Sequence, residues 1–226
     1  NNIESFKEQI DPSVAAIMIE TIQGEGGIFP ADKEFLQALQ QLCQDNDLLL
    51  IIDEVQCGIG RTGDFFAYQE SGITPDAIGM AKGLGGGFPI GAIWIEQAHE
   101  ELFQPGSHGT TFGGNPLASV SGKAVIDTIL EDKLLDKVQK QSKKWHKQIH
   151  DLKDKYPNKI HAIRGKGYMI GISVDDALAI THSARDKGLL IVPAGHNTIR
   201  LLPPLIAEET HLNQSIKILD SIFKDA

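Results

Sequence analysis

The feature that most constrains the fold is Leu48–Ile52, an unbroken run of five apolar residues that ends at Asp53. A run without an intervening polar residue suits a strand buried on both faces, as in parallel sheets. A similar run, Val14–Ile19, precedes it, and the segment between them, Ala31–Asp45, repeats apolar residues at helical spacing. Strand, helix and strand in this order predict a βαβ unit and a largely parallel sheet.

The remaining chain divides into two further patterns. Two more strands are expected at Asp76–Met80 and Gly91–Ile95, followed by long helices between Pro116 and Tyr156. After these comes a smaller α/β pattern, with strands near 160–164, 168–174, 189–192 and 198–202 and helices near 176–187 and 208–223. We therefore predict an α/β protein in which residues 1–124 hold a mostly parallel sheet, and residues 125–226 hold connecting helices and a smaller C-terminal domain.

Charge and composition exclude several classes of protein. The chain has 21 Lys and Arg against 30 Asp and Glu, a net charge of −9, which disfavours nucleic acid as the main partner. No apolar run approaches the roughly 18 residues of a membrane span, and no secretory signal follows Asn1. Cys43 and Cys57 form no CxxC motif, and His146 and His150 have no evident third ligand. We expect a cytoplasmic protein without a metal site.

Lys82 is the first residue whose place in the sequence suggests a chemical role. It follows the expected strand Asp76–Met80 and precedes a glycine-rich stretch, Gly83–Gly87, that leaves the amine uncrowded. A lysine becomes a nucleophile when burial or a nearby cation lowers its pKa, and a single such amine suffices for Schiff-base chemistry. An ordinary surface lysine is the alternative.

Asp53 is the second residue whose place in the sequence suggests a chemical role. A carboxylate at the carboxyl end of a buried parallel strand lies where open α/β sheets bind ligands. One interpretation is a Walker-B-like acid that holds Mg²⁺ for a nucleotide, and another is an aspartate that pairs with the pyridinium nitrogen of pyridoxal phosphate (PLP). The absence of a GxxxxGK[ST] loop weakens the nucleotide interpretation. A loop-capping acid is the structural alternative.

Three other groups carry weaker signals. Glu20 and Glu25 flank a glycine turn, where they suit a cation or a substrate amine, or simply a solvated turn. Thr110 and Thr111 precede an expected helix start, which suits phosphate, although such residues also cap helices. Arg200 in an apolar strand indicates either a bidentate carboxylate clamp or a charge on an edge strand.

Taken in order, these segments form a specific series. The series resembles the class III PLP-dependent aminotransferases over the whole length of the chain, and the resemblance implies PLP-dependent transferase fold type I. The segments that carry it are Glu20–Gly27 (ETIQGEGG), Ile52–Gly63 (IDEVQCGIGRTG), Ala81–Pro89 (AKGLGGGFP), Gly109–Pro116 (GTTFGGNP) and Ile199–Pro204 (IRLLPP).

The resemblance implies roles toward the cofactor. Lys82 looks like the lysine that forms the Schiff base with PLP, Asp53 like the partner of the pyridine nitrogen, and Gln56 like a donor near the ring's O3′. Thr111, with Thr110 beside it, looks like the phosphate contact given to the neighbouring subunit's cofactor. The resemblance therefore implies a homodimer with shared active sites.

It also implies roles toward the substrate. Arg200 looks like the clamp for the α-carboxylate, Glu25 like its switch partner, and Glu20 like an acid at the rim of the ring. The implied reaction transfers an amino group between N-acetylornithine and 2-oxoglutarate in arginine biosynthesis, with ornithine or 4-aminobutyrate as alternative donors.

The family resembled here has a further segment before this point. That segment carries a serine- and glycine-rich phosphate cup and the aromatic residue that stacks on the ring, and neither is among these 226 residues. We therefore expect the chain to correspond to the C-terminal portion of such an enzyme. A catalytically incomplete fragment is the remaining alternative.

Overall fold

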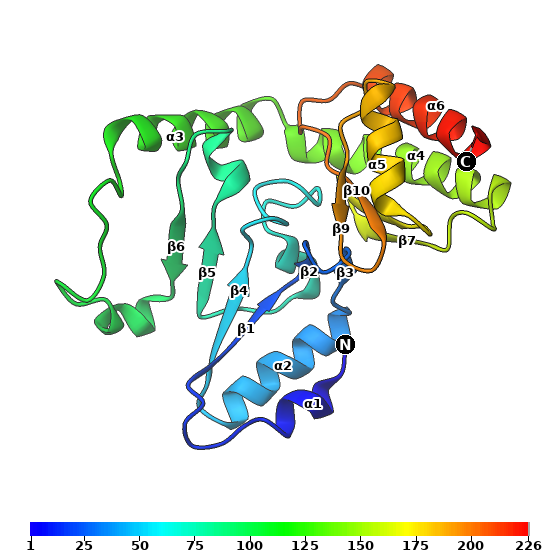
Figure 1. The fold of residues 1–226 in the computed structure, drawn as a ribbon. Coiled ribbons are helices and arrows are strands. Elements are labelled where there is room, and N and C mark those ends of the chain that lie inside the picture. The colour runs from blue at the N-terminus through cyan, green and yellow to red at the C-terminus, as the bar shows by residue number, and fades with distance from the viewer. Residues whose placement is uncertain (226) are drawn as a thin grey trace. The chain divides into compact units, whose positions relative to one another are not determined.

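The computed structural model describes residues 1–225, which form two compact units, each with its own sheet (Figure 1). Unit 1 comprises Asn1–Thr21, Ala31–Ile59 and Asp64–Asp132; unit 2 comprises Ile22–Pro30, Gly60–Gly63 and the chain from Lys133 onward.

The units differ from the linear division expected at residues 124 and 125. The short segments Ile22–Pro30 and Gly60–Gly63 belong to unit 2, because their hydrogen bonds are made there: Gly27 O accepts from Arg164, and Arg61 O accepts from the N–H of Tyr168 at 2.8 Å. The boundary in the helical region lies after Asp132, because one helix runs on to Glu131.

Unit 1 is built on a sheet with the order β1-β4-β5-β6. Its strands are β1 (Ala16–Glu20), β4 (Leu49–Asp53), β5 (Ala77–Met80) and β6 (Ala92–Ile95). The first three are parallel, and β6 runs antiparallel to β5. The predicted mostly parallel sheet is therefore confirmed, and all four strands overlap the ranges expected for them.

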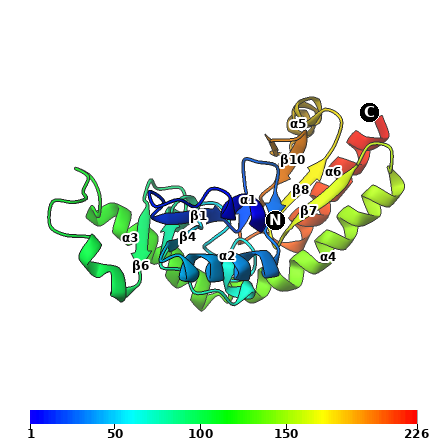
Figure 2. The ribbon, with the colours of Figure 1, turned by 90° about the horizontal axis from the view of Figure 1, so that it is seen from below.

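One face of this sheet is covered by α2 (Lys33–Asp45), with the short α1 (Ile3–Lys7) beside it (Figure 2). The apolar stripe of α2 packs on the inward residues of β1 and β4, which is why alternate residues of β4 are buried. The core of this layer consists of Ile17, Phe35, Leu36, Leu39, Cys43, Leu50, Ile52 and Ile73.

The rest of unit 1 consists of short 3₁₀ turns and one long helix. The turns span Ala67–Ser71, Lys82–Gly85 and Gln97–Leu102. Helix α3 (Pro116–Glu131) begins where Asn115 Oδ1 accepts the N–H of Ala118 at 3.0 Å, with Pro116 in the first turn.

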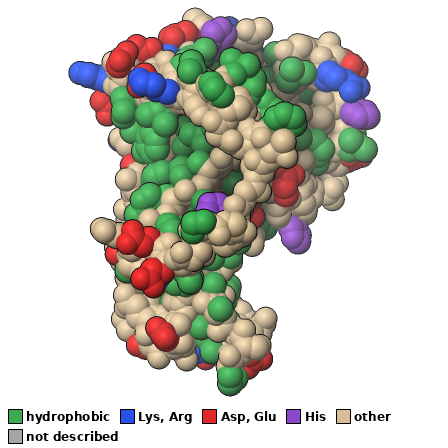
Figure 3. Space-filling model, turned by 90° about the vertical axis from the view of Figure 1, so that its left-hand side faces the viewer, with side chains coloured by type: hydrophobic (Ala, Val, Ile, Leu, Met, Phe, Trp, Pro, Cys, Tyr) green, Lys and Arg blue, Asp and Glu red, His purple; other side chains and the backbone are tan. Residues whose placement is uncertain are grey.

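Large hydrophobic side chains are exposed on the side of unit 1 that carries β6, α3 and the segment between them (Figure 3). Apolar groups that gather on a surface are typical of faces that pack against further protein. The exposed residues on these elements are Ile93, Trp94, Leu102, Phe112, Leu117, Val120 and Leu130.

Unit 2 contains an antiparallel sheet in the order β7-β8-β10-β9. Its strands are β7 (Ala162–Lys166), β8 (Met169–Ser173), β9 (Val192–Ala194) and β10 (Thr198–Leu201); its helices are α4 (Leu134–Lys155), α5 (Ala177–Asp186) and α6 (Glu209–Asp225). A small hairpin joins β2 (Ile22–Gln23) to β3 (Phe29–Pro30). The predicted smaller α/β domain is confirmed, with a core around Trp145, whose indole N–H donates to Ser215 Oγ at 3.1 Å.

Within residues 1–225, no helix combines the length and apolar character needed to cross a membrane.

Candidate active site

The carboxyl ends of three parallel strands bring candidate residues to one edge of the unit 1 sheet. Asp53 is the last residue of β4, and Glu20 is the last residue of β1 and its register partner. Lys82 follows the end of β5, two residues after Met80. Because parallel strands end at a common edge, the structure places Glu20, Asp53 and Lys82 there together.

The sheet beside Asp53 is open. Asp53 is paired in register with Gly79, so their Cβ positions face the same side of the sheet. A Cβ built on Gly79 would meet no atom within 4 Å, which leaves space next to the half-buried carboxylate. Asp53 Oδ1 accepts the N–H of Val55 at 2.8 Å, which fixes its orientation. Gln56 follows in the same turn and is half-buried.

The backbone of Lys82 has an unusual conformation. Its φ is +44°, in the left-handed region that non-glycine residues rarely adopt. The turn that begins at Lys82 closes through a hydrogen bond of 3.0 Å from Leu84 N to Ala81 O. Strained residues of this kind cluster at functional sites. The Lys82 side chain is exposed, so its amine is accessible at the sheet edge.

Glu54 has a role that the sequence analysis missed. It is fully buried, and its carboxylate accepts the N–H of Ala67 at 3.0 Å, the N–H of Tyr68 at 2.9 Å and the thiol of Cys57 at 3.4 Å. Burial raises the pKa of Glu54, although these hydrogen bonds oppose the shift. The available signal was its position directly after Asp53, since neighbouring strand residues face opposite sides. Glu54 ties the segment after β4 to the turn at Ala67.

Thr110 and Thr111 lie in an exposed segment before α3. The helix cap is Asn115, so the capping alternative is wrong for both threonines. Among the interactions described for residues 1–225, none joins either threonine to Asp53 or Lys82.

Arg200 forms an ion pair within unit 2. Its Nη1 lies 2.6 Å from Oε1 of Glu25, and the two side chains differ sharply in exposure, 7% for Arg200 and 73% for Glu25. Strand β10 lies between β8 and β9, so the edge-strand alternative for Arg200 is wrong. A buried guanidinium partnered by an exposed carboxylate is suited to exchange that partner for another anion, because Glu25 loses little by returning to water.

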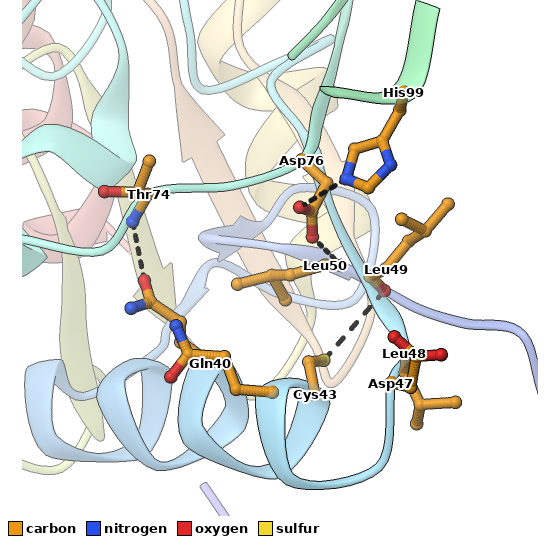
Figure 4. A pocket seen from close by; sticks show the side chains of 10 residues that line it. Gln40, Cys43, Asp47, Leu48, Leu49, Leu50, Thr74, Asp76 and His99 are labelled. Atoms are coloured by element: carbon orange, nitrogen blue, oxygen red, sulfur yellow. Dashed lines mark hydrogen bonds and ion pairs between the residues drawn. The ribbon is translucent and has the colours of Figure 1, made fainter. Parts of the chain in front are cut away.

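Two other polar groups have structural roles. His146 is half-buried: its Nε2 donates to Gly167 O at 2.9 Å, and burial lowers its pKa. Asp76, near the amino ends of the parallel strands, accepts the N–H of Leu50 at 2.7 Å and lies 3.0 Å from His99 Nε2 (Figure 4).

The Asp76 group borders a cavity of about 210 Å³. With Glu96 and His99 it offers three ligand atoms within 4.8 Å of one another. Both oxygens of Asp76 are already engaged by the protein, so we assign this cluster to ordering the starts of β4 and β5.

Comparison with known proteins decides the family. Residues 1–223 match the model of the family described as aminotransferase class-III. The chain belongs to the class III aminotransferases. Members of this family depend on PLP. The resemblance in the sequence series is therefore confirmed at the level of the family and of its fold.

Individual relatives and solved structures that resemble the chain are also aminotransferases. The chain is 46% identical to an acetylornithine aminotransferase of Caldanaerobacter subterraneus subsp. tengcongensis, covering 100% of this chain and 57% of the relative, and 44% identical to that of Methanocaldococcus jannaschii, covering 100% and 56%. Two solved structures match in fold. They are an Elizabethkingia anophelis acetylornithine aminotransferase (TM-score 0.92, 33% identity, covering 100% of this chain and 58% of that one) and a Plasmodium yoelii ornithine aminotransferase (0.93, 30%, 99% and 61%). The chain thus spans little more than half the length of its curated relatives.

Proposed function

We propose that this chain is part of a PLP-dependent enzyme that transfers an amino group between N-acetylornithine and 2-oxoglutarate. The observation that carries the proposal is the placement of Asp53 and Lys82 at one sheet edge beside the open position of Gly79. An amine, a carboxylate and free space over a glycine fit the chemistry of a flat, positively charged pyridinium ring. The similarity to acetylornithine aminotransferases supports the substrate.

Asp53 and Lys82 have the central chemical roles. Bound PLP supplies an electron sink for the substrate's α-carbon. The Asp53 carboxylate would accept a hydrogen bond from the protonated ring nitrogen, and the bond that it accepts from Val55 N holds it in place. The Lys82 amine would hold the cofactor covalently and, as a free base, would take a proton from the substrate's Cα. Gln56 donates a hydrogen bond near the ring oxygen, and Glu20 lines the rim.

Arg200 binds the substrate's α-carboxylate. Its guanidinium is almost completely buried and requires an anionic partner, which Glu25 provides when no substrate is bound. The substrate carboxylate and Glu25 therefore exclude one another, and Glu25 acts as the switch.

A second copy of the protein completes each site. Thr110 and Thr111 lie in an exposed segment with Phe112, Leu117 and Val120 beside them, all exposed as well. We assign this surface to a homodimer in which the threonines contact the partner's cofactor phosphate. We also propose a cytoplasmic location, in keeping with two cysteines that form no disulfide.

The test is chemical labelling in the full-length protein. Reduction with borohydride in the presence of PLP, followed by peptide mapping, places the pyridoxyl group on Lys82. The variant Lys82→Ala loses the label, whereas Lys123→Ala, which removes an exposed lysine of α3, keeps it. A label on another lysine with Lys82 unmodified overturns the assignment. Initial rates with N-acetylornithine, ornithine and 4-aminobutyrate then identify the donor.

A further inference from the structure

Arg164 in β7 is a charged residue of unit 2 to which the proposed function assigns no role. Its Nε and Nη2 both donate to the carbonyl oxygen of Gly27, at 3.2 and 3.1 Å, and Nη2 also donates to Thr198 Oγ1 at 3.0 Å. The guanidinium also lies over the ring of Phe29, 4.2 Å from its centroid. Arg164 thus contacts the Gly27 carbonyl, the Thr198 hydroxyl and the Phe29 ring. Gly27 and Phe29 lie in the segment Ile22–Pro30, which also carries Glu25.

The segment has little freedom where Arg164 holds it. Gly27 has a φ of +111°, and a Cβ there would lie 2.7 Å from Gly195 O. On the other side of the turn, Glu25 O accepts the N–H of Gly195 at 2.8 Å. The backbone around Glu25 is therefore fixed against the sheet of unit 2, while the Glu25 side chain stays exposed and contacts Arg200.

We propose that Arg164 is a positioning residue: by holding the Gly27 carbonyl it places the Glu25 carboxylate on Arg200 and so sets how strongly Glu25 competes with substrate carboxylates. A lysine cannot replace it fully, because a single ammonium lacks the planar, forked donors that bind the carbonyl and stack on Phe29. The placement of the segment stands on the contacts alone; its effect on substrate binding rests on the proposed role of Arg200.

The placement is tested without any activity assay. In the full-length protein, hydrogen exchange of the Gly195 amide reports on the turn, because its acceptor is Glu25 O. Arg164→Met accelerates this exchange about 3- to 10-fold, as expected for loosening one hydrogen bond, and Arg164→Lys gives an intermediate value. The amide of Ile172 in β8 keeps its protection in both variants. Arg185→Met, which removes an exposed arginine of α5, changes neither amide.

A folded Arg164→Met protein with unchanged Gly195 exchange overturns the inference. Where that variant does not fold, Arg164→Lys, which keeps the charge but loses the forked donors to Gly27 O, must still accelerate the exchange. Unchanged exchange in a folded Arg164→Lys protein likewise contradicts the proposal.

The effect on binding is tested with glutarate, an unreactive dicarboxylate. Glu25→Gln tightens glutarate binding about 2- to 5-fold by removing an exposed competitor, and Arg164→Met tightens it in the same direction. The double variant binds no tighter than Glu25→Gln alone, because the position of the turn no longer matters once the carboxylate is gone. Additive effects overturn the positioning role. No effect of Glu25→Gln, together with accelerated exchange in Arg164→Met, instead contradicts the proposed role of Arg200 and leaves the placement standing.

Discussion

Glu54 Oε1 accepts the backbone N–H of Tyr68 at 2.9 Å, which joins a fully buried carboxylate to a turn 14 residues further along the chain. Its second oxygen accepts from Ala67 N and from the thiol of Cys57. This buried network begins one residue after Asp53, so the same strand end that presents Asp53 is held in place by its neighbour. These hydrogen bonds provide the partners that a carboxylate needs at a fully buried position, where apolar side chains are more common.

Replacing Glu54 by alanine leaves the backbone N–H groups of Ala67 and Tyr68 without their acceptor. We expect the free energy of unfolding to fall by about 2–4 kcal/mol, and by less for Glu54→Gln, which keeps one acceptor oxygen. Denaturant unfolding measures the change. Glu34→Ala, at an exposed position of α2, is the control and stays within about 0.5 kcal/mol. Equal losses in the alanine and control variants would contradict the role assigned to Glu54.

Asp53→Asn separates cofactor chemistry from stability. The amide keeps the shape and the oxygen that accepts from Val55 N, so the melting temperature should change little. The ring nitrogen loses its anionic partner, so α-proton exchange of a bound amino acid in D₂O should fall by at least about tenfold, the factor that corresponds to 1.4 kcal/mol. Exchange at the original rate would show that Asp53 does not face the ring.

The positive φ of Lys82 is expected to lower the free energy of unfolding of the protein. Its positive φ suits glycine, so Lys82→Gly should be more stable than Lys82→Ala by about 1 kcal/mol, while both variants lose transamination. At Lys123, in the interior of α3, the order should reverse by about 1 kcal/mol, because a helix favours alanine. Thermal or denaturant unfolding of the four variants provides the comparison. The same order at both positions would argue against strain at Lys82.

The burial of His146 predicts that the free energy of unfolding depends on pH. Burial lowers its pKa below the ordinary value of 6.5, so the unfolded chain binds the proton more strongly. The free energy of unfolding should therefore fall as the pH falls from 6.5 toward the lowered pKa. His146→Gln, which retains a donor for Gly167 O, should show a smaller fall over this range. His182→Gln, on the exposed face of α5, serves as the control; a matching change in that variant would rule out His146 as the source.

Gly165 marks the tightest backbone approach in the β7–β8 hairpin. Its φ is +112°, and a Cβ there would lie 2.0 Å from Met169 O, so Gly165→Ala should cost more than about 3 kcal/mol or prevent folding. Gly188 also has a positive φ, +82°, but a Cβ there meets no atom within 4 Å, so Gly188→Ala should cost only about 1–2 kcal/mol. Comparable unfolding midpoints would contradict this ranking.

Local patterns in the sequence are enough to predict the parallel strands and the residues at their carboxyl ends. Short apolar runs and the amphipathic helix between them are local signals, and chain order then places Asp53 and Lys82 at the ends of neighbouring strands. The smaller second domain is predicted by the same kind of signal, because its strands and helices alternate at short spacing. The proposed roles of these residues come from the resemblance to the family, residue by residue.

Which distant residues meet depends instead on the folded chain. Glu25 and Arg200 are separated by 175 positions, and their ion pair depends on a turn that folds against the sheet of unit 2 through Arg164. The burial of Glu54 was likewise beyond local patterns, because its carboxylate is held by hydrogen bonds to Ala67 and Tyr68, which the linear sequence does not place nearby. Periodicity determines on which face of its helix or strand a residue lies, whereas long-range packing determines which residues it contacts there.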